Sequence, residues 1–212
     1  MNARQAIVEA SQRLQDSGLN SGTSGNISMR HGAALLITPT SVAVEDMTAD
    51  DIVEFDTPSG PSAGQRPSSE WRFHRDIYQA RADVLAIVHA HPPHATALSM
   101  LRQPLPAVHY MIAAFGTHQV ACSDYATYGT QALSDAVITA LGTSWGCLLG
   151  SHGMLTCGET LAHALWRAEE LEALSQQFIL AKQAGDPVIL PKDEIDRVIE
   201  KFASGYGVSR QP

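Results

Sequence analysis

Two histidines stand two residues apart at the end of an apolar run, and this short segment constrains the fold more than any other. Residues 84–88 (VLAIV) favour a strand, and His89 and His91 follow directly, before Pro92 and Pro93 end it. Residues i and i+2 of a strand face the same side, so both imidazoles should point to one spot. The sequence therefore predicts a strand whose end delivers two nitrogen donors, as a three-histidine metal site requires.

The composition of the chain argues against several classes of protein. Its 212 residues include 14 lysines and arginines against 22 aspartates and glutamates, and the basic residues are scattered, so we expect no nucleic-acid partner. No stretch approaches the roughly 20 apolar residues of a membrane helix, so we expect no membrane partner. The three cysteines cannot all pair, and the N-terminus lacks a signal-peptide core. We therefore expect a cytoplasmic protein with a single domain over residues 1–212.

Helical and strand periodicities alternate along the chain. Apolar residues at helical spacing predict helices over residues 7–14, 73–80, 94–100, 133–141 and about 160–184, and a last one from about residue 191. Strands are expected over residues 26–29, 34–37, 84–91, 147–149 and 154–156. Only residues 57–67, rich in Pro, Gly and Ser, resemble a mobile loop. Helices interleaved with closely spaced strands predict an α/β fold with a mixed sheet covered on both faces.

The histidine pair needs at least one further ligand to complete a metal site. His152, in the tight turn before Gly153, is the candidate third ligand, and Glu70, where a helix is expected to begin, is the fourth. A structural zinc site is disfavoured because the cluster lacks cysteine. A lone histidine is more often a structural hydrogen-bonding residue, so we assign that role to the other six: His31, His74, His94, His109, His118 and His163.

A set of backbone and hydroxyl donors predicts an anion site. Two glycines before Asn26 allow the main chain to approach a ligand closely. Thr40 and Ser41 add hydroxyls after a strand, and Ser68 and Ser69 stand at an expected helix start, where free N–H groups favour a phosphate. Each motif alone is common in ordinary turns and helix caps. Together with a metal site they indicate a small phosphorylated substrate.

Two residues could move protons in such a site. Glu70 could leave the metal and act as a general base, with the metal charge and burial shifting its pKa in opposite directions. Tyr110 could act as an acid toward a developing alkoxide, although its local sequence alone favours an aromatic residue of the core. The three lysines, Lys182, Lys192 and Lys201, all fall in or near the C-terminal helices, which disfavours a Schiff-base mechanism.

Several longer motifs stand in a definite order along nearly the whole chain: GTSGNIS (22–28), ITPT (37–40), PSSEWRFH (67–74), HAH (89–91), HYMIAA (109–114), YATYGT (125–130) and HG (152–153). In this order and spacing they resemble the class II aldolase/adducin-head family. The resemblance implies a single three-layer α-β-α domain with a central mixed, largely antiparallel sheet. It also implies a cyclic homotetramer and a zinc-dependent retro-aldol cleavage of a ketose 1-phosphate to dihydroxyacetone phosphate and a short aldehyde.

The resemblance also implies roles for individual residues. His89, His91 and His152 match the zinc-binding histidines of the family, and Glu70 matches the acid that contacts the metal and shuttles a proton. Tyr110 matches a tyrosine that assists at the aldehyde oxygen and reaches in from a neighbouring subunit. Active sites would then lie at subunit interfaces.

The implied phosphate pocket consists of Asn26, Thr40, Ser68 and Ser69. Ser41 stands where the family has glycine in its phosphate loop, which could alter the backbone donor there. Two further departures are Ser151, in place of a histidine or asparagine, and Tyr128, in place of a phenylalanine that lines the aldehyde side.

Other activities of the same scaffold stay open at this stage. The expected substrate is L-fuculose 1-phosphate or a near relative, such as a 5-deoxypentulose or methylthiopentulose 1-phosphate. The alternatives are a same-fold epimerase, dehydratase or decarboxylase, acting for example on ribulose 5-phosphate or methylthioribulose 1-phosphate, and a non-catalytic adducin-head-like binding module.

Overall fold

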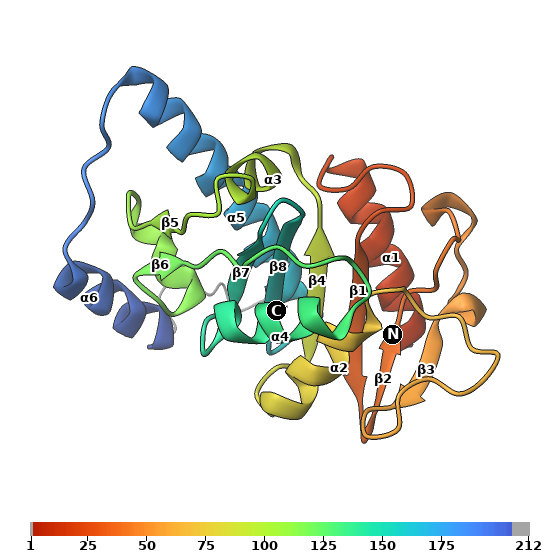
Figure 1. The fold of residues 1–212 in the computed structure, drawn as a ribbon. Coiled ribbons are helices and arrows are strands. Elements are labelled where there is room, and N and C mark those ends of the chain that lie inside the picture. Colours follow the sequence, from red (N-terminus) through yellow and green to blue (C-terminus); the bar gives the residue numbers. More distant parts are fainter. Residues whose placement is uncertain (1, 205–212) are drawn as a thin grey trace.

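A six-stranded sheet forms the centre of the computed structural model, which describes residues 2–204. Its strands are β1 (Asn26–His31), β2 (Ala34–Ile37), β3 (Val53–Asp56), β4 (Ala86–Ala90), β7 (Gly146–Leu149) and β8 (Gly153–Gly158) (Figure 1). They lie in the order β3-β2-β1-β4-β8-β7, and every pairing between them is antiparallel. In the described part of the chain, the parallel contact is an isolated bridge between Cys122 and Leu148. The predicted α/β class with a largely antiparallel central sheet is confirmed.

Helices cover both faces of this sheet (Figure 1). On one face lie α1 (Ala3–Asp16), α3 (Pro93–Ser99) and α5 (Leu161–Ala184). On the other lie α2 (Trp71–Ala80) and α4 (Gln131–Leu141). The strand β4 is buried along its whole length because it contributes to both cores: Val88 packs under the first group of helices and Ile87 under the second. This is the three-layer arrangement expected from the sequence.

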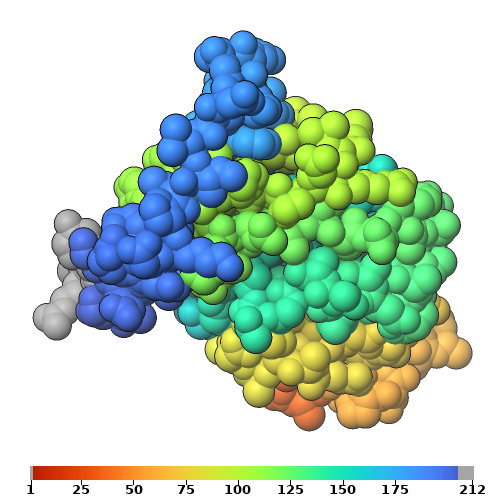
Figure 2. All heavy atoms as spheres, turned by 60° about the vertical axis from the view of Figure 1, so that its left-hand side comes forward, coloured from red at the N-terminus to blue at the C-terminus, as the bar shows by residue number. Residues whose placement is uncertain are grey.

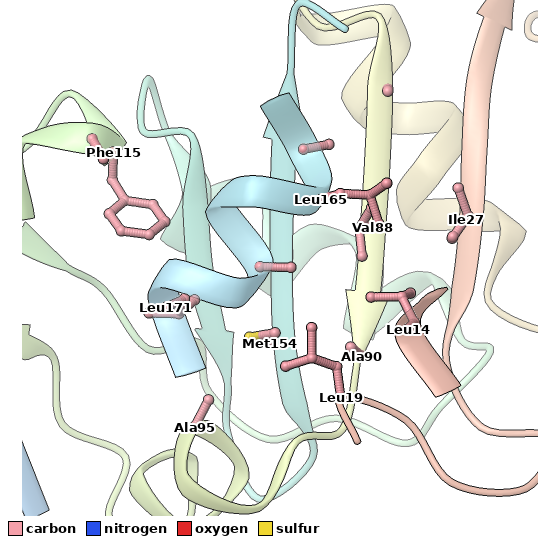
Figure 3. Packing of buried hydrophobic residues seen from close by; sticks show 14 of the residues in the cluster. Leu14, Leu19, Ile27, Val88, Ala90, Ala95, Phe115, Met154, Leu165 and Leu171 are labelled. Atoms are coloured by element: carbon pink, nitrogen blue, oxygen red, sulfur yellow. The ribbon is translucent and has the colours of Figure 1, made fainter. Parts of the chain in front are cut away.

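The larger core lies between α1, α5 and the sheet (Figure 3). Leu14 of α1 and Leu165 and Leu171 of α5 are almost fully buried there, against Val88 of β4 and Met154 of β8. Burial of this kind contributes about 1.5–3 kcal/mol for each large apolar side chain. The strand β4, which ends at the histidine pair, is therefore held between buried apolar side chains.

The C-terminal elements pack at one side of the sheet. The C-terminal part of α5 projects from the rest of the molecule, and an extended segment leads from it back to α6 (Lys192–Ala203) (Figure 2). Ile195 of α6 is buried, while Val198, Ile199 and Phe202 of the same helix are half-buried. This helix lies against the 3-10 helix η3 (Tyr110–Phe115), near a two-stranded ribbon of β5 (Leu105–Pro106) and β6 (Gln119–Val120).

Three strands and one helix start differ from the expectations. The strands β3, β5 and β6 have no counterpart among the predicted strands, because β5 and β6 have two residues each and the four residues of β3, Val-Glu-Phe-Asp, alternate too briefly to stand out. The helix expected to begin at Ser68 or Ser69 begins at Trp71, with Glu70 at the N-cap position. The backbone N–H of Ser68 donates instead to Thr38 O (2.9 Å), which ties the serines to the end of β2.

Among the described residues, no helix combines the length and the apolar character needed to cross a bilayer. Two shorter 3-10 helices, η1 (Val44–Asp46) and η2 (Ala49–Asp51), complete the described elements and lie between β2 and β3.

Candidate metal centre

The four predicted ligands come from three separate parts of the fold. His89 is the fourth residue of β4 and faces the same side as Ile87, toward α2, where Phe73 contacts its ring edge-on at a centroid distance of 5.5 Å. His91 follows the same strand, and His152 lies in the turn between β7 and β8. Glu70 is the N-cap residue of α2, but its side chain does not cap the helix.

The structure brings these four side chains together. One ligand atom from each lies within 4.8 Å of all the others. The Nε2 atoms of His89 and His91 are 2.9 Å apart, and the carboxylate of Glu70 places Oε2 3.1 Å from His89 Nε2 and Oε1 3.3 Å from His152 Nε2. His89 and Glu70 are buried, while His91 and His152 are half-buried and face a cavity.

Neighbouring backbone and side-chain groups fix the orientation of the histidines. His89 donates from Nδ1 to the carbonyl of Met154 (2.8 Å), so its Nε2 lone pair faces the cluster. The backbone N–H of His91 donates to Asn20 Oδ1 (3.0 Å), and that of His152 to Ser99 Oγ (3.3 Å). Sequence reasoning missed Asn20 and Ser99, because neither stands in a pattern that differs from ordinary loop or helix chemistry.

Burial and mutual charge shift the pKa values of the cluster in opposite directions. Burial, followed by the charge of His89, lowers the pKa of His91 to about 3 and that of His152 to about 4. Burial also works against the charged form of His89, but the carboxylate of Glu70 outweighs it and raises the pKa of His89. Burial works against the Glu70 carboxylate as well, but the charges of His89 and His152 and the hydrogen bonds from His89 and Asn26 together outweigh it and lower the pKa of Glu70. Two neutral imidazoles and one carboxylate therefore face each other at neutral pH.

This donor set fits a divalent metal ion. Imidazole nitrogens and a carboxylate oxygen are ligands of zinc and of several neighbouring transition metals, and three or four of them in one place are typical of catalytic sites. Glu70 Oε1 is buried without a hydrogen-bond partner, which is costly unless another group meets it. A cation among the three Nε2 atoms would meet that oxygen as well.

A cavity of about 610 Å³ opens beside the cluster, lined in part by Glu70, His91 and His152. All five residues predicted for the anion site line the same cavity: Asn26, Thr40, Ser41, Ser68 and Ser69. Among the described residues that line it there is no lysine or arginine, so the polar contacts on offer are hydroxyls, an amide and backbone N–H groups. Such donors can hold an anion, as backbone nests and turn hydroxyls do in other proteins.

Ser41 has the backbone conformation that the glycine of the family would have at this position. Its φ of 61° lies in the left-handed region that favours glycine, so the serine keeps the backbone conformation that a glycine would adopt there. Ser151, directly before His152, has a φ of 53° and is the second such residue on the cavity wall. Strain of this kind is found mainly at functional sites.

Tyr110 is the one predicted site residue that belongs neither to the cluster nor to the lining of the cavity beside it. It stands at the start of η3 with 50% of its surface exposed, and it lines a different, more apolar cavity with Trp145 and Trp166. Two other aromatic residues, Tyr125 and Tyr128, do line the cavity beside the cluster and are more than half exposed.

Comparisons with known proteins identify the family of this chain. Residues 5–179 match the model of the family described as class II aldolase and adducin N-terminal domain. The chain is 43% identical over 208 residues to 5-methylthioribulose-1-phosphate/5-deoxyribulose-1-phosphate aldolase of Rhodospirillum rubrum, covering 98% of this chain and 94% of the relative. It is 44% identical over 207 residues to L-fuculose phosphate aldolase of Escherichia coli K12, covering 97% and 95%.

A solved structure of L-fuculose 1-phosphate aldolase superimposes with a TM-score of 0.91 and 38% identity, covering 95% of this chain and 96% of that one. The fold, the family model and the relatives matched over nearly their full length thus identify the same family. We conclude that this chain belongs to the class II aldolase and adducin N-terminal domain family, as a metal-dependent aldehyde-lyase.

Proposed function

We propose that this protein is a zinc-dependent aldolase that cleaves a ketose 1-phosphate reversibly, between C3 and C4, to dihydroxyacetone phosphate and a short aldehyde. The main support is that one cavity holds both a Glu/His3 cluster and a set of hydroxyl and backbone donors suited to a phosphate. The relatives' names provide the substrate class, because they are aldolases of L-fuculose phosphate and of 5-methylthioribulose or 5-deoxyribulose 1-phosphate. L-Fuculose 1-phosphate and these pentulose phosphates are thus the candidate substrates.

His89, His91 and His152 would hold the metal, with Glu70 as the fourth ligand. When bound, a divalent ion would supply a Lewis acid at the ketone and hydroxyl oxygens of the substrate, where negative charge develops. The protein keeps His91 and His152 neutral, and it orients His89 through Met154, so that all three Nε2 atoms can bind the metal once His89 has lost its Nε2 proton. Loss of any of these imidazoles would remove one of the ligands of the metal and weaken its binding.

Glu70 is our candidate for proton transfer at C3. Its lowered pKa keeps it a carboxylate at neutral pH, which suits a base in the direction of aldol condensation. By microscopic reversibility the same oxygen returns the proton to C3 in the cleavage direction. Oε1 is the better placed oxygen, because Oε2 already accepts a hydrogen bond from Asn26 (3.0 Å).

The phosphate would lie among Asn26, Thr40, Ser41, Ser68 and Ser69, which line the cavity within one chain. Since these donors are neutral, the metal would be the positive charge closest to the phosphate. Binding would then depend on hydrogen-bond geometry more than on long-range attraction.

Tyr110 would act at the aldehyde oxygen of a neighbouring subunit in a homotetramer. Its half-exposed ring, away from the cavity of its own chain, supports this part of the proposal. A phenol there could donate a proton to, or take one from, the C4 oxygen as the C3–C4 bond forms or breaks.

Release of dihydroxyacetone phosphate tests the activity directly. We expect zinc-loaded protein to release it from at least one of L-fuculose 1-phosphate, 5-deoxyribulose 1-phosphate and methylthioribulose 1-phosphate, measured by a coupled NADH assay. L-Ribulose 5-phosphate should be returned unchanged. Absence of dihydroxyacetone phosphate from every ketose 1-phosphate would refute the proposal, and conversion of ribulose 5-phosphate to its C4 epimer would replace it with an epimerase.

Replacing one ligand should abolish tight metal binding. We expect the parent protein to bind one zinc ion per chain, and His152→Ala to bind it at least about 10–100-fold more weakly, by calorimetric titration. His163→Ala is the matched control, since His163 is exposed and bonded to Glu159, and it should bind like the parent. Equal affinities of His152→Ala and the parent would remove His152 from the site.

The pH dependence of zinc binding follows from the pKa shifts of the cluster. His91 and His152 have lowered pKa values of about 3 and about 4 and carry no proton at neutral pH, whereas His89 has a raised pKa. A proton on His89 therefore competes with the metal once the pH falls below that raised pKa. We expect the logarithm of the zinc association constant to fall by about one per pH unit there. A slope of two or three would contradict neutral His91 and His152.

Glu70→Gln should separate catalysis from binding. The amide keeps the shape of the side chain but cannot accept the C3 proton, so we expect kcat to fall by about 10²–10⁴-fold with little change in KM. Zinc content, measured in parallel, shows whether the metal is retained, and Glu200→Gln on the exposed side of α6 serves as the control. An unchanged kcat in zinc-loaded Glu70→Gln would exclude the role.

Mixing two inactive variants tests whether Tyr110 acts across an interface. Tyr110→Phe lacks the hydroxyl and His152→Ala lacks a metal ligand, so each alone should be nearly inactive. In mixed oligomers, a Tyr110→Phe subunit keeps its metal and can receive Tyr110 from a His152→Ala neighbour. We expect co-expression to restore a measurable fraction of parent activity. A mixture as inactive as its components would contradict action across an interface, and a Tyr110→Phe variant as active as the parent would place Tyr110 outside the reaction.

A further inference from the structure

A chain of buried hydrogen bonds leads from Glu70 into the interior of the sheet. Asn26 Nδ2 donates to Glu70 Oε2 (3.0 Å), Asn26 Oδ1 lies 2.5 Å from His74 Nε2, and His74 Nδ1 lies 2.7 Å from Ser28 Oγ. All four residues are buried, and His74 and Ser28 are completely so. Asn26 and Ser28 belong to β1 and His74 to α2, so the chain joins the sheet to the helix that begins after Glu70.

The direction of each bond in this chain follows from what each atom can donate. A carboxylate and an amide oxygen only accept hydrogen bonds. Asn26 must therefore turn its amide nitrogen to Glu70 and its oxygen to His74, which requires a proton on His74 Nε2. Burial, followed by the charge of His89, lowers the pKa of His74 to about 3, so the ring is neutral and its Nδ1 accepts from Ser28.

The opposite orientation of Asn26 is unfavourable. Its oxygen would then lie 3.0 Å from the carboxylate oxygen of Glu70, with no hydrogen between them. At the other end, its amide nitrogen would face Nε2 of His74, and a hydrogen bond would form there only if the proton of His74 moved to Nδ1. The carboxylate of Glu70 thus decides which way the amide of Asn26 points, and the Nε2–H of His74 holds the amide in that orientation.

The fixed amide distinguishes the two oxygens of Glu70. Oε2 is held by Asn26, whereas Oε1 is buried with no hydrogen-bond partner and points toward His152. The amide nitrogen of Asn26 has a second hydrogen, and Asn26 also lines the cavity of the proposed phosphate site. One side chain, fixed by His74, therefore contacts both the proton-transfer group and the anion pocket.

We propose that His74 is a positioning residue for Glu70: through Asn26 it anchors Oε2 and leaves Oε1 as the oxygen that exchanges the C3 proton. This inference rests on the proposed aldolase function for its catalytic consequence, but the hydrogen-bond chain itself does not. His74 belongs neither to the metal cluster nor to the lining of the cavity, and its hydrogen bond toward the site is the one to Asn26.

Nitrogen NMR of the parent protein tests the hydrogen-bond chain without any substrate. With ¹⁵N-labelled histidine, we expect the resonances of His74 to show a neutral ring protonated at Nε2 from pH 6 to pH 8. A ring protonated at Nδ1, or a charged ring, would overturn the inference. This result does not depend on whether the protein cleaves a ketose phosphate.

Two matched substitutions test the consequence. Gln places an amide nitrogen near the position of His Nε2 and can still donate to Asn26, whereas Asn is shorter and reaches only the Nδ1 position. We expect His74→Asn to lower kcat by about 10–100-fold and to weaken zinc binding by a similar factor. Substitution of residues that support metal ligands generally has effects of this size. His74→Gln should restore both. Tyr78→Phe is the control for the packing of α2, because Tyr78 OH contacts Ser28 Oγ (2.9 Å) and takes part in none of the three bonds.

Thermal unfolding of each variant shows whether it is folded, and only folded variants enter the comparison. Equal kcat and zinc affinity in folded His74→Asn and the parent would refute the positioning role, as would an equal loss in His74→Gln and His74→Asn. If the parent cleaves no ketose phosphate, the aldolase proposal fails separately, and the zinc affinities of the same variants still decide the role of His74.

Discussion

The register of β4 between β1 and β8 is the constraint on which the site depends. His89 pairs with Asn26 of β1 and with Leu155 of β8, and Ala90 pairs with Met154. A slip by one residue would turn His89 and His91 to the opposite face of the sheet. It would also separate His89 from the Met154 carbonyl that orients its ring. The two buried cores on either side of β4 exclude such a slip, because Ile87 and Val88 would exchange their surroundings.

Charge balance links the cluster to the cavity beside it. The one ionised carboxylate of the cluster is Glu70, and no lysine or arginine is among the described residues that line the cavity. A phosphate entering this space would therefore meet neutral hydrogen-bond donors and a fixed negative charge. A divalent ion among the three imidazoles reverses the sign of that field. The proposed metal would therefore favour binding of the substrate's phosphate group, in addition to its role at the reacting carbon atoms.

Much of the site could be predicted because its parts are local in sequence. The strand end with His89 and His91, the loop before Asn26 and the turn at His152 each have a pattern that identifies them, and their order supplied the family. The contribution of His74 could not be recognised in this way, since a buried helical histidine looks the same whether or not it orients a neighbour 48 residues away. The backbone at Ser41 and the edge strand β3 also depend on tertiary contacts, which override weak local preferences. Tyr110 faces away from the cavity of its own chain, so its proposed role depends on a neighbouring subunit.

The most direct test of the account is the position of the metal. Anomalous diffraction at the zinc edge, from crystals of the zinc-loaded protein, should show one ion bound by Nε2 of His89, His91 and His152 at about 2.0–2.1 Å. An oxygen of Glu70 should lie beside it in the absence of substrate. An ion held by other residues, or a map in which any one of the three imidazoles points away from it, would contradict the central claim.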